Sequence, residues 1–270
     1  MNEYYVNLLE ILKGYGSVAV AFSGGVDSTF LLRAAHEALG DKAFAVTAAI
    51  PAVPERELQA AKDFCAALGV RHVIVQPDVM ALPGFYENPP DRCYHCKKRI
   101  FSTLLDAARA GGAAVVAEGS NLDDEGDYRP GLRAIAELQV KSPLREAGLT
   151  KGMIRALSRE LGLPTWDKPS CACLASRFAY GERITLEGLR RVDAAEAFLH
   201  DRGFRQVRVR VHGDLARVEA EPEDIPRLVA PELRAQTDAY LRGLGFAYVA
   251  LDLRGYRTGS MNEILKKENE

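Results

Sequence analysis

The chain has 270 residues, of which 47% are hydrophobic and 27% are charged, an ordinary composition for a globular protein of one large or two modest domains. Its formal net charge of -2 provides no global basic field for RNA or DNA, so we expect no nucleic-acid partner. No run approaches the roughly 18 apolar residues that span a bilayer, and the N-terminus lacks the basic start of a secretory signal. We therefore expect a cytoplasmic protein without a membrane partner.

Strands alternate with helices in the first part of the chain. Residues 17–22 form a short apolar run typical of a buried strand, and residues 28–39 have the pattern of a helix that stops at Gly40. The alternation continues with expected strands at 43–49, 71–75 and 113–117, and with expected helices at 54–68, 97–110 and 150–161. This order predicts a doubly wound parallel sheet with crossover helices, the α/β class.

The pattern changes after Gly181. A long helix is expected at 186–202, followed by a strand at 207–211 in which valines alternate with charged residues, apolar side in and charged side out. Its expected hairpin partner lies at 215–220, and a helix near 232–244 and a strand at 248–253 follow. We predict an α/β domain at 1–180 and a smaller α+β domain at 181–270.

A glycine-rich hexapeptide joins the first expected strand to the first expected helix. It reads Ser23-Gly24-Gly25-Val26-Asp27-Ser28. The glycines let the backbone approach an anion closely, and hydroxyls and exposed N–H groups at the helix start can then bind it. The alternative is an ordinary Gly-Gly turn with Asp27 and Ser28 as helix caps. The Walker pattern of other phosphate loops is absent from the chain.

The hexapeptide resembles the loop of the PP-loop (ATP pyrophosphatase) family. The resemblance implies that ATP is cleaved between its α- and β-phosphates, that pyrophosphate sits in the loop and that a substrate oxygen takes the adenylate. It implies that Asp27 helps hold Mg²⁺. It also implies the nucleotide-binding residues Ser23, Gly24, Gly25, Val26, Asp27 and Ser28.

The five cysteines also suggest chemistry. Cys65 lies in an amphipathic run and is expected in the core, whereas Cys93 pairs with Cys96 and Cys171 with Cys173 in two tight groups. A thiolate is both a strong nucleophile and a soft metal ligand. Four such thiols suit zinc or an iron–sulfur cluster, but structural thiols have the same spacing, so these alternatives stay open.

Four further segments resemble the LarE family of ATP-dependent sulfur transferases. They are residues 91–98 (DRCYHCKK), 125–131 (EGDYRPG), 170–181 (SCACLASRFAYG) and 207–219 (VRVRVHGDLARVE). The resemblance implies a role in synthesis of the nickel-pincer nucleotide cofactor. The implied substrate is pyridinium-3,5-biscarboxylic acid mononucleotide, whose carboxylates are adenylylated before AMP leaves and sulfur enters. It further implies a homo-oligomer, with substrate binding, sulfur transfer and subunit contacts in the smaller domain.

Two sulfur sources occur in proteins of this kind. One type sacrifices a cysteine, and the other binds a [4Fe-4S] cluster through three cysteines and loads external sulfide on the open iron. This chain is similar to the second type, which implies Cys93, Cys96 and Cys173 as ligands and Cys173 as the cysteine nearest the chemistry. The role of Cys171 stays open between ligand, reserve and bystander.

Several charged residues are candidates for substrate contacts. Arg177 is expected to face the activated carboxylate. Arg208 and Arg210 project from one strand face and suit a mononucleotide phosphate or pyrophosphate, although two solvated arginines would look the same. Arg129 lies in a polar loop after an expected strand, where α/β folds bind ligands. Glu196, Glu219 and Asp224 could bind metal or phosphate, or form a solvated face.

Other functions remain possible from the sequence. RNA thiolation predicts a basic groove and an RNA-binding module, and carboxylate amidation predicts a glutaminase partner; neither feature is evident. A regulatory protein that only binds a nucleotide is a further alternative.

Overall fold

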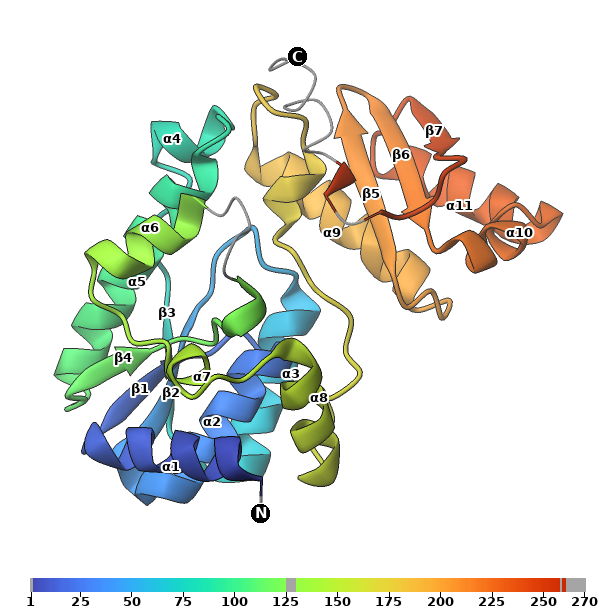
Figure 1. Cartoon of the computed structure of the whole chain (residues 1–270). Helices are drawn as coiled ribbons and strands as arrows, with labels where there is room; N and C mark the ends of the chain where they lie inside the picture. The colour runs from blue at the N-terminus through green and yellow to red at the C-terminus, as the bar shows by residue number, and fades with distance from the viewer. Residues whose placement is uncertain (1, 125–129, 258, 261–270) are drawn as a thin grey trace, which may run out of the picture. The chain divides into compact units, whose positions relative to one another are not determined.

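The computed structural model describes residues 2–124, 130–257 and 259–260, and the chain forms two compact units (Figure 1). Unit 1 comprises residues 1–82 and 91–171, and unit 2 comprises residues 83–90 and 172–270. Arg129 therefore lies outside the described residues. The assignment of residues 1–180 and 181–270 to two domains stays a prediction.

Unit 1 is built on a four-stranded parallel sheet. Its strands are β1 (Val18–Ala21), β2 (Ala43–Ala48), β3 (His72–Val75) and β4 (Val115–Ala117), in the order β3-β2-β1-β4. Val20 of the central strand pairs with Ala45 on one side and Ala117 on the other. Strands β1 and β2 are apolar and almost entirely buried, as expected for a sheet covered on both faces. The predicted α/β class is confirmed.

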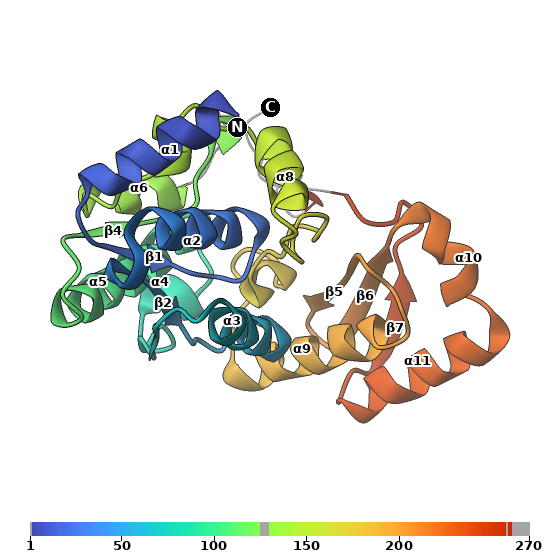
Figure 2. The ribbon, with the colours of Figure 1, turned by 90° about the horizontal axis from the view of Figure 1, so that it is seen from below.

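Helices cover both faces of this sheet. They are α1 (Glu3–Gly14), α2 (Val26–Leu39), α3 (Glu55–Leu68), α5 (Arg92–Ala110), α6 (Pro130–Glu137), α7 (Pro143–Glu146) and α8 (Lys151–Glu160). Helix α2 packs against β1, β2, α1 and α8, whereas α5 packs against the sheet and α6 (Figures 1 and 2). From β1 to β3 each new strand is added on one side of the sheet, whereas β4 is added on the other side of β1. The right-handed crossover through α5 therefore lies on the face opposite to α2. The carboxyl ends of β1 and β4 thereby become neighbours.

Helix α5 corrects one sequence expectation. It begins at Arg92 rather than at Lys97, because the Tyr94 N–H already bonds the Asp91 carbonyl and His95 contacts the Asp91 carboxylate one turn back. Cys93 and Cys96 are consequently helical residues one turn apart, not part of a loop that precedes the helix.

Unit 2 contains a three-stranded sheet in the order β5-β6-β7. The strands are β5 (Val207–His212), β6 (Leu215–Ala220) and β7 (Tyr248–Leu251), with β5 antiparallel and β7 parallel to β6. The other elements are α4 (Pro83–Tyr86), α9 (Leu186–His200), α10 (Ile225–Leu228) and α11 (Pro231–Gly243). The predicted hairpin is confirmed.

The alternation in β5 predicted that its charged face would be exposed to solvent, and this prediction is wrong. Arg208 and Arg210 are only 3% and 5% exposed, so both faces of the strand are buried. Alternation of valine and arginine predicts two chemically different faces, but it does not say whether the polar face is covered.

The helices within the described residues include none that is long and apolar enough to cross a membrane.

Candidate active site

The phosphate loop connects β1 to α2 at the carboxyl end of the sheet. Gly24 has φ +71, a left-handed conformation that glycine adopts without strain, and Gly25 is the N-cap of α2. The cap has no side chain, so the first N–H groups of the helix receive no side-chain hydrogen bond from it. This arrangement directs backbone donors and the positive end of the helix dipole toward an anion.

Two serine hydroxyls hold the loop closed. Ser28 Oγ lies 3.1 Å from Ser23 Oγ, accepts a hydrogen bond from Ser23 N–H and donates to the Gly25 carbonyl. Gly119, which follows β4, packs against the loop so tightly that a Cβ there would lie 3.1 Å from Asp27 Cβ and Ser28 N. The loop is thus fixed by its own hydroxyls and by the neighbouring strand end.

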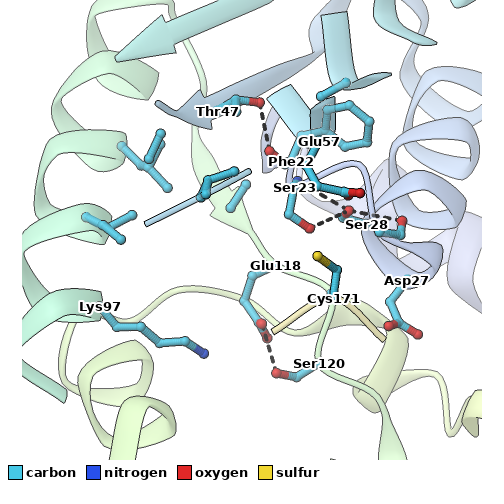
Figure 3. A pocket seen from close by; sticks show the side chains of 18 of the residues that line it. Phe22, Ser23, Asp27, Ser28, Thr47, Glu57, Lys97, Glu118, Ser120 and Cys171 are labelled. Atoms are coloured by element: carbon cyan, nitrogen blue, oxygen red, sulfur yellow. Dashed lines mark hydrogen bonds between the residues drawn. The ribbon is translucent and has the colours of Figure 1, made fainter. Parts of the chain in front are cut away.

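A pocket of about 650 Å³ opens in front of this loop (Figure 3). Its polar side includes Ser23, Gly25 and Ser28, and its other lining residues include an apolar set contributed by β2, the loop after it and α5. This set contains Val46, Ile50, Ile100, Phe101 and Leu104. This arrangement suits a nucleotide, because the base can pack against the apolar wall while the loop binds the phosphates.

Asp27 projects into the pocket from the first turn of α2. Its carboxylate forms a salt bridge with Lys151 Nζ and lies 3.4 Å from Asn121 Nδ2. The Lys151 backbone N–H donates in turn to Asp123, another pocket residue. Carboxylate oxygens of this kind are the ligands that Mg²⁺ prefers. Lys151 is 124 residues away along the chain, so no local pattern in the sequence could reveal it.

Glu118 lies at the end of β4 and faces the same pocket. It is 7% exposed, and its two carboxylate oxygens accept hydrogen bonds from Ser120 Oγ at 2.8 Å and Ser142 Oγ at 2.6 Å. Lys97 extends toward it from α5 (Figure 3). Sequence reasoning did not single out Glu118, although its place directly after a buried strand was a usable signal.

The structure separates the five thiols by environment. Cys65 is 1% exposed, and burial raises the pKa of its thiol to about 12, which confirms the expected core residue. Cys171 is exposed and lines the pocket, and Figure 3 shows its sulfur pointing between the phosphate loop and Glu118. Cys93, Cys96 and Cys173 are partly exposed and, like the other two, are not disulfide-bonded.

The predicted cluster ligands come from both units. Cys93 and Cys96 belong to unit 1, and Cys173 belongs to unit 2. Accessible, unbridged thiols are the donors that an iron–sulfur cluster requires, so the donor chemistry of these residues fits. Across residues 2–124, 130–257 and 259–260, no three His, Cys, Asp or Glu side chains gather as a metal site.

Arg177 is completely buried in unit 2, in a 3₁₀ turn at Leu174–Arg177. Its guanidinium donates to both carboxylate oxygens of Glu196, at 2.8 and 2.7 Å, and also to the carbonyls of Ala172 and Cys173. Arg177 therefore orders the backbone that carries Cys173. Its expected contact with an activated carboxylate stays a prediction.

Glu196 is 1% exposed, so the solvated alternative for this residue is wrong. Burial alone would raise its pKa, but hydrogen bonds and charges from Arg177, the charge of Arg208 and the Val209 N–H hold the pKa below its ordinary value. The buried pair is consequently ionised at neutral pH.

The buried polar face of the small sheet gathers several arginines. Arg210 of β5 donates to Glu219 of β6 and to the Ser176 carbonyl, and Arg217, two residues before Glu219 on β6, also donates to Glu219. Glu219 is fully buried, so a solvated face is excluded here too. Asp224 lies at the 3₁₀ turn Pro222–Asp224 and is half-buried.

Donors remain available on this face. Arg210 Nε, Arg217 Nε and His212 Nε2 are buried and have no hydrogen-bond partner within the described part of the chain. Arg208 donates to the Val207 carbonyl and lies over the Tyr256 ring. A buried guanidinium N–H without an acceptor is costly, so the unpartnered Nε atoms of Arg210 and Arg217 favour an anionic ligand such as a phosphate.

Comparisons with known proteins agree with this geometry. The chain is 42% identical to an uncharacterized protein of Synechocystis sp., with 97% of each chain covered. It is 40% identical to the pyridinium-3,5-bisthiocarboxylic acid mononucleotide synthase of Lactiplantibacillus plantarum, over 96% of this chain and 94% of that one. It is 29% identical to the argininosuccinate synthase of Natronomonas pharaonis, over 54% of this chain and 39% of that one. No protein-family model matches the chain.

A Ser-Gly-Gly loop between a parallel strand and a helix, with an adjoining pocket, defines an ATP-using enzyme of the PP-loop superfamily, to which these relatives also belong. Within that superfamily, the near full-length similarity to the Lactiplantibacillus synthase is decisive. The chain belongs to the LarE family and is an ATP-dependent sulfurtransferase.

Proposed function

We propose that this enzyme adenylylates the carboxylates of pyridinium-3,5-biscarboxylic acid mononucleotide and converts them into thiocarboxylates during synthesis of the nickel-pincer nucleotide cofactor. The observation that carries the proposal is the joint presence, in one pocket, of the phosphate loop, Asp27 and a cysteine-bearing segment. The activity for which the Lactiplantibacillus relative is named, synthesis of pyridinium-3,5-bisthiocarboxylic acid mononucleotide, supports this choice of substrate.

The first step is adenylyl transfer in the pocket of unit 1. A substrate carboxylate oxygen attacks the α-phosphorus of ATP, and the bond to the β-phosphate breaks, so that pyrophosphate leaves. The loop from Ser23 to Ser28 binds the departing pyrophosphate through its backbone donors. Asp27 would hold Mg²⁺, which would offset the developing negative charge when bound. Lys151, paired with Asp27, adds a second cation beside the same phosphates.

The second step replaces oxygen by sulfur. A sulfur nucleophile attacks the acyl carbon of the adenylate, and AMP leaves with the electron pair of the broken C–O bond. A [4Fe-4S] cluster, held by Cys93, Cys96 and Cys173, supplies an open site for external sulfide when it is bound. The chain itself contributes order: Arg177 fixes the carbonyls of Ala172 and Cys173 and so restrains the Cys173 thiol.

The arginine-rich face of unit 2 is the proposed phosphate site for the mononucleotide. Arg208 and Arg210 lie on the same face of β5, and Nε of Arg210 has no acceptor among the described residues. A phosphate monoester brings the charge and oxygens that these donors require. Arg129 is proposed as an additional nucleotide contact on sequence grounds alone, and a homo-oligomer is proposed on the family resemblance.

The test separates the two steps. Wild-type protein, the mononucleotide substrate, MgATP and sulfide are incubated without oxygen, and pyrophosphate release and product mass are followed. Replacement of oxygen by sulfur at each carboxylate is expected, with AMP and pyrophosphate formed in step. Asp27→Ala should abolish pyrophosphate release, and Cys173→Ala should release pyrophosphate but form no thiocarboxylate.

Three results would overturn the proposal. Equal loss of both steps in Cys173→Ala would remove the division of labour between pocket and cysteine. Pyrophosphate release that does not respond to the mononucleotide would point to another substrate. ATP binding without any pyrophosphate release would favour a regulatory role.

A further inference from the structure

Lys168 contacts the phosphate loop and lies on the segment that leads to Cys171, and its partner Glu57 lines the pocket. Its Nζ donates to the Gly24 carbonyl at 3.0 Å and forms a salt bridge with Glu57 at 2.7 Å. The Lys168 side chain is 22% exposed and the Glu57 side chain 12%, so both charges lie largely out of water. A bond of this kind between a buried cation and a loop carbonyl restrains the loop more strongly than a surface contact does.

The bond from Lys168 acts on the peptide group between Gly24 and Gly25. The carbonyl and the N–H of a trans peptide point in opposite directions, so a carbonyl held toward Lys168 turns the Gly25 N–H the other way. Gly25 lines the pocket, and its N–H has no acceptor within the described residues. Because Gly24, at φ +71, has no side chain that restrains this peptide, the Lys168 bond contributes to its orientation.

We propose that Lys168, oriented by Glu57, is a positioning residue that holds the Gly24–Gly25 peptide with its N–H toward the β- and γ-phosphates of ATP. The inference rests on the proposed use of this loop for pyrophosphate. Lys168 does not touch the nucleotide in this role; it acts through the backbone of the loop. The bond joins Lys168 to the backbone of the protein itself, so the donor would be preorganised rather than recruited by the nucleotide.

The same bond links the loop to the cysteine segment. Arg155 of α8 donates to the carbonyls of Trp166 and Lys168, which fixes the main chain three residues before Cys171. Lys168 thus connects a rigidly held backbone to the phosphate loop. The chain offers a matched control here, because Arg155 holds the segment without touching Gly24.

The experiment compares binding of MgATP, pyrophosphate and AMP by calorimetry in wild type, Lys168→Met, Lys168→Arg and Arg155→Met. Loss of one charge-assisted hydrogen bond predicts about a tenfold weaker binding of ATP and pyrophosphate in Lys168→Met. AMP has no β- or γ-phosphate, so its affinity should not change. Lys168→Arg should recover part of the loss, and Arg155→Met, which loosens the main chain but keeps the Lys168 side chain, should reduce the preference of ATP over AMP less than Lys168→Met does.

Glu57→Gln distinguishes positioning from simple charge. Removal of a carboxylate near the phosphates would tighten ATP binding if only the electrostatic field mattered. Positioning predicts the opposite, a severalfold weaker binding of ATP, because Lys168 loses the partner that aims it at Gly24. This variant also serves if Lys168→Met does not fold.

Three results would overturn the inference. They are equal losses for ATP and AMP in Lys168→Met, tighter ATP binding in Glu57→Gln, and a selective ATP loss in Arg155→Met as large as that in Lys168→Met. Wild-type protein that fails to bind ATP and pyrophosphate would instead refute the proposed function of the pocket, so the two failures are distinguishable.

Discussion

The phosphate loop of unit 1 and the ion-pair network of unit 2 both concentrate hydrogen-bond donors, but they use them differently. The loop directs backbone N–H groups into an open pocket, and among the described residues its serine hydroxyls bond one another and the loop backbone. In unit 2, Arg177 and Arg210 direct most of their donors to buried carboxylates and carbonyls of the protein. The donors of the phosphate loop are thus available to a ligand, whereas most donors of Arg177 and Arg210 already bond the protein itself.

This contrast predicts different consequences of mutation. Removal or displacement of a loop group should damage nucleotide binding more than stability, because the loop directs its backbone donors into an open pocket. Removal of a buried ion-pair partner should damage stability first, since the remaining charge cannot be hydrated. The three predictions below test this distinction.

The largest effect is expected for Arg177→Ala. The substitution leaves Glu196 ionised and buried without its bidentate partner, so the free energy of unfolding should fall by about 3–5 kcal/mol. Urea unfolding measures this loss. Arg190→Ala, at an exposed position of α9, the helix that carries Glu196, is the control and should change stability little. The double variant Arg177→Ala/Glu196→Ala should lose less than the sum of the two single variants. A loss below 1 kcal/mol in Arg177→Ala would show that the pair is not closed as described.

The same contrast explains what could be predicted from the sequence. The phosphate loop is six contiguous residues whose role depends on backbone, glycines and a helix start, so the local pattern indicates it directly. The strands and crossover helices were predictable for a similar reason, since each carries its own hydrophobic period. Helix α5 was predicted too short because the first turn, Arg92 to His95, has no apolar period and is held by contacts to Asp91.

Residues that act through distant partners were not predictable. The salt bridge between Lys151 and Asp27 joins two separate helices, and Lys168 bonds the carbonyl of Gly24, which lies 144 residues earlier in the sequence. Arg208 and Arg210 were recognised as candidates, but their burial depends on Glu219 of the neighbouring strand, on Tyr256 and on Ser260. Periodicity places a side chain on a face, and only tertiary packing decides what covers that face.

An intermediate effect is expected for Gly119→Ala, which tests the pocket side of the comparison. The new Cβ would lie 3.1 Å from Ser28 N and Asp27 Cβ, so the loop must shift by a few tenths of an ångström. Overpacking of this kind costs about 1–3 kcal/mol of stability, and displaced donors should weaken ATP binding as well. Gly14→Ala is the control, because a Cβ there meets nothing within 4 Å and alanine is favoured in a helix. Unchanged ATP affinity in Gly119→Ala would show that the loop tolerates movement and is not rigidly preorganised.

The smallest effect is a pH dependence centred on Glu196. Its pKa in the folded protein lies below the ordinary value near 4.5, because Arg177, Arg208 and the Val209 N–H together outweigh the effect of burial. A depressed carboxyl pKa stabilises the folded state above the unfolded pKa, and this contribution declines as the pH falls through the folded value. The difference in unfolding free energy between wild type and Glu196→Gln should therefore be constant from pH 7 to about 5 and should shrink in more acidic buffer. Asp63→Asn, an exposed substitution in unit 1, should show a much weaker dependence. A gap that grows on acidification would mean that the Glu196 pKa is raised by burial, and the ion-pair network of unit 2 would then be neutral in part rather than closed by charge.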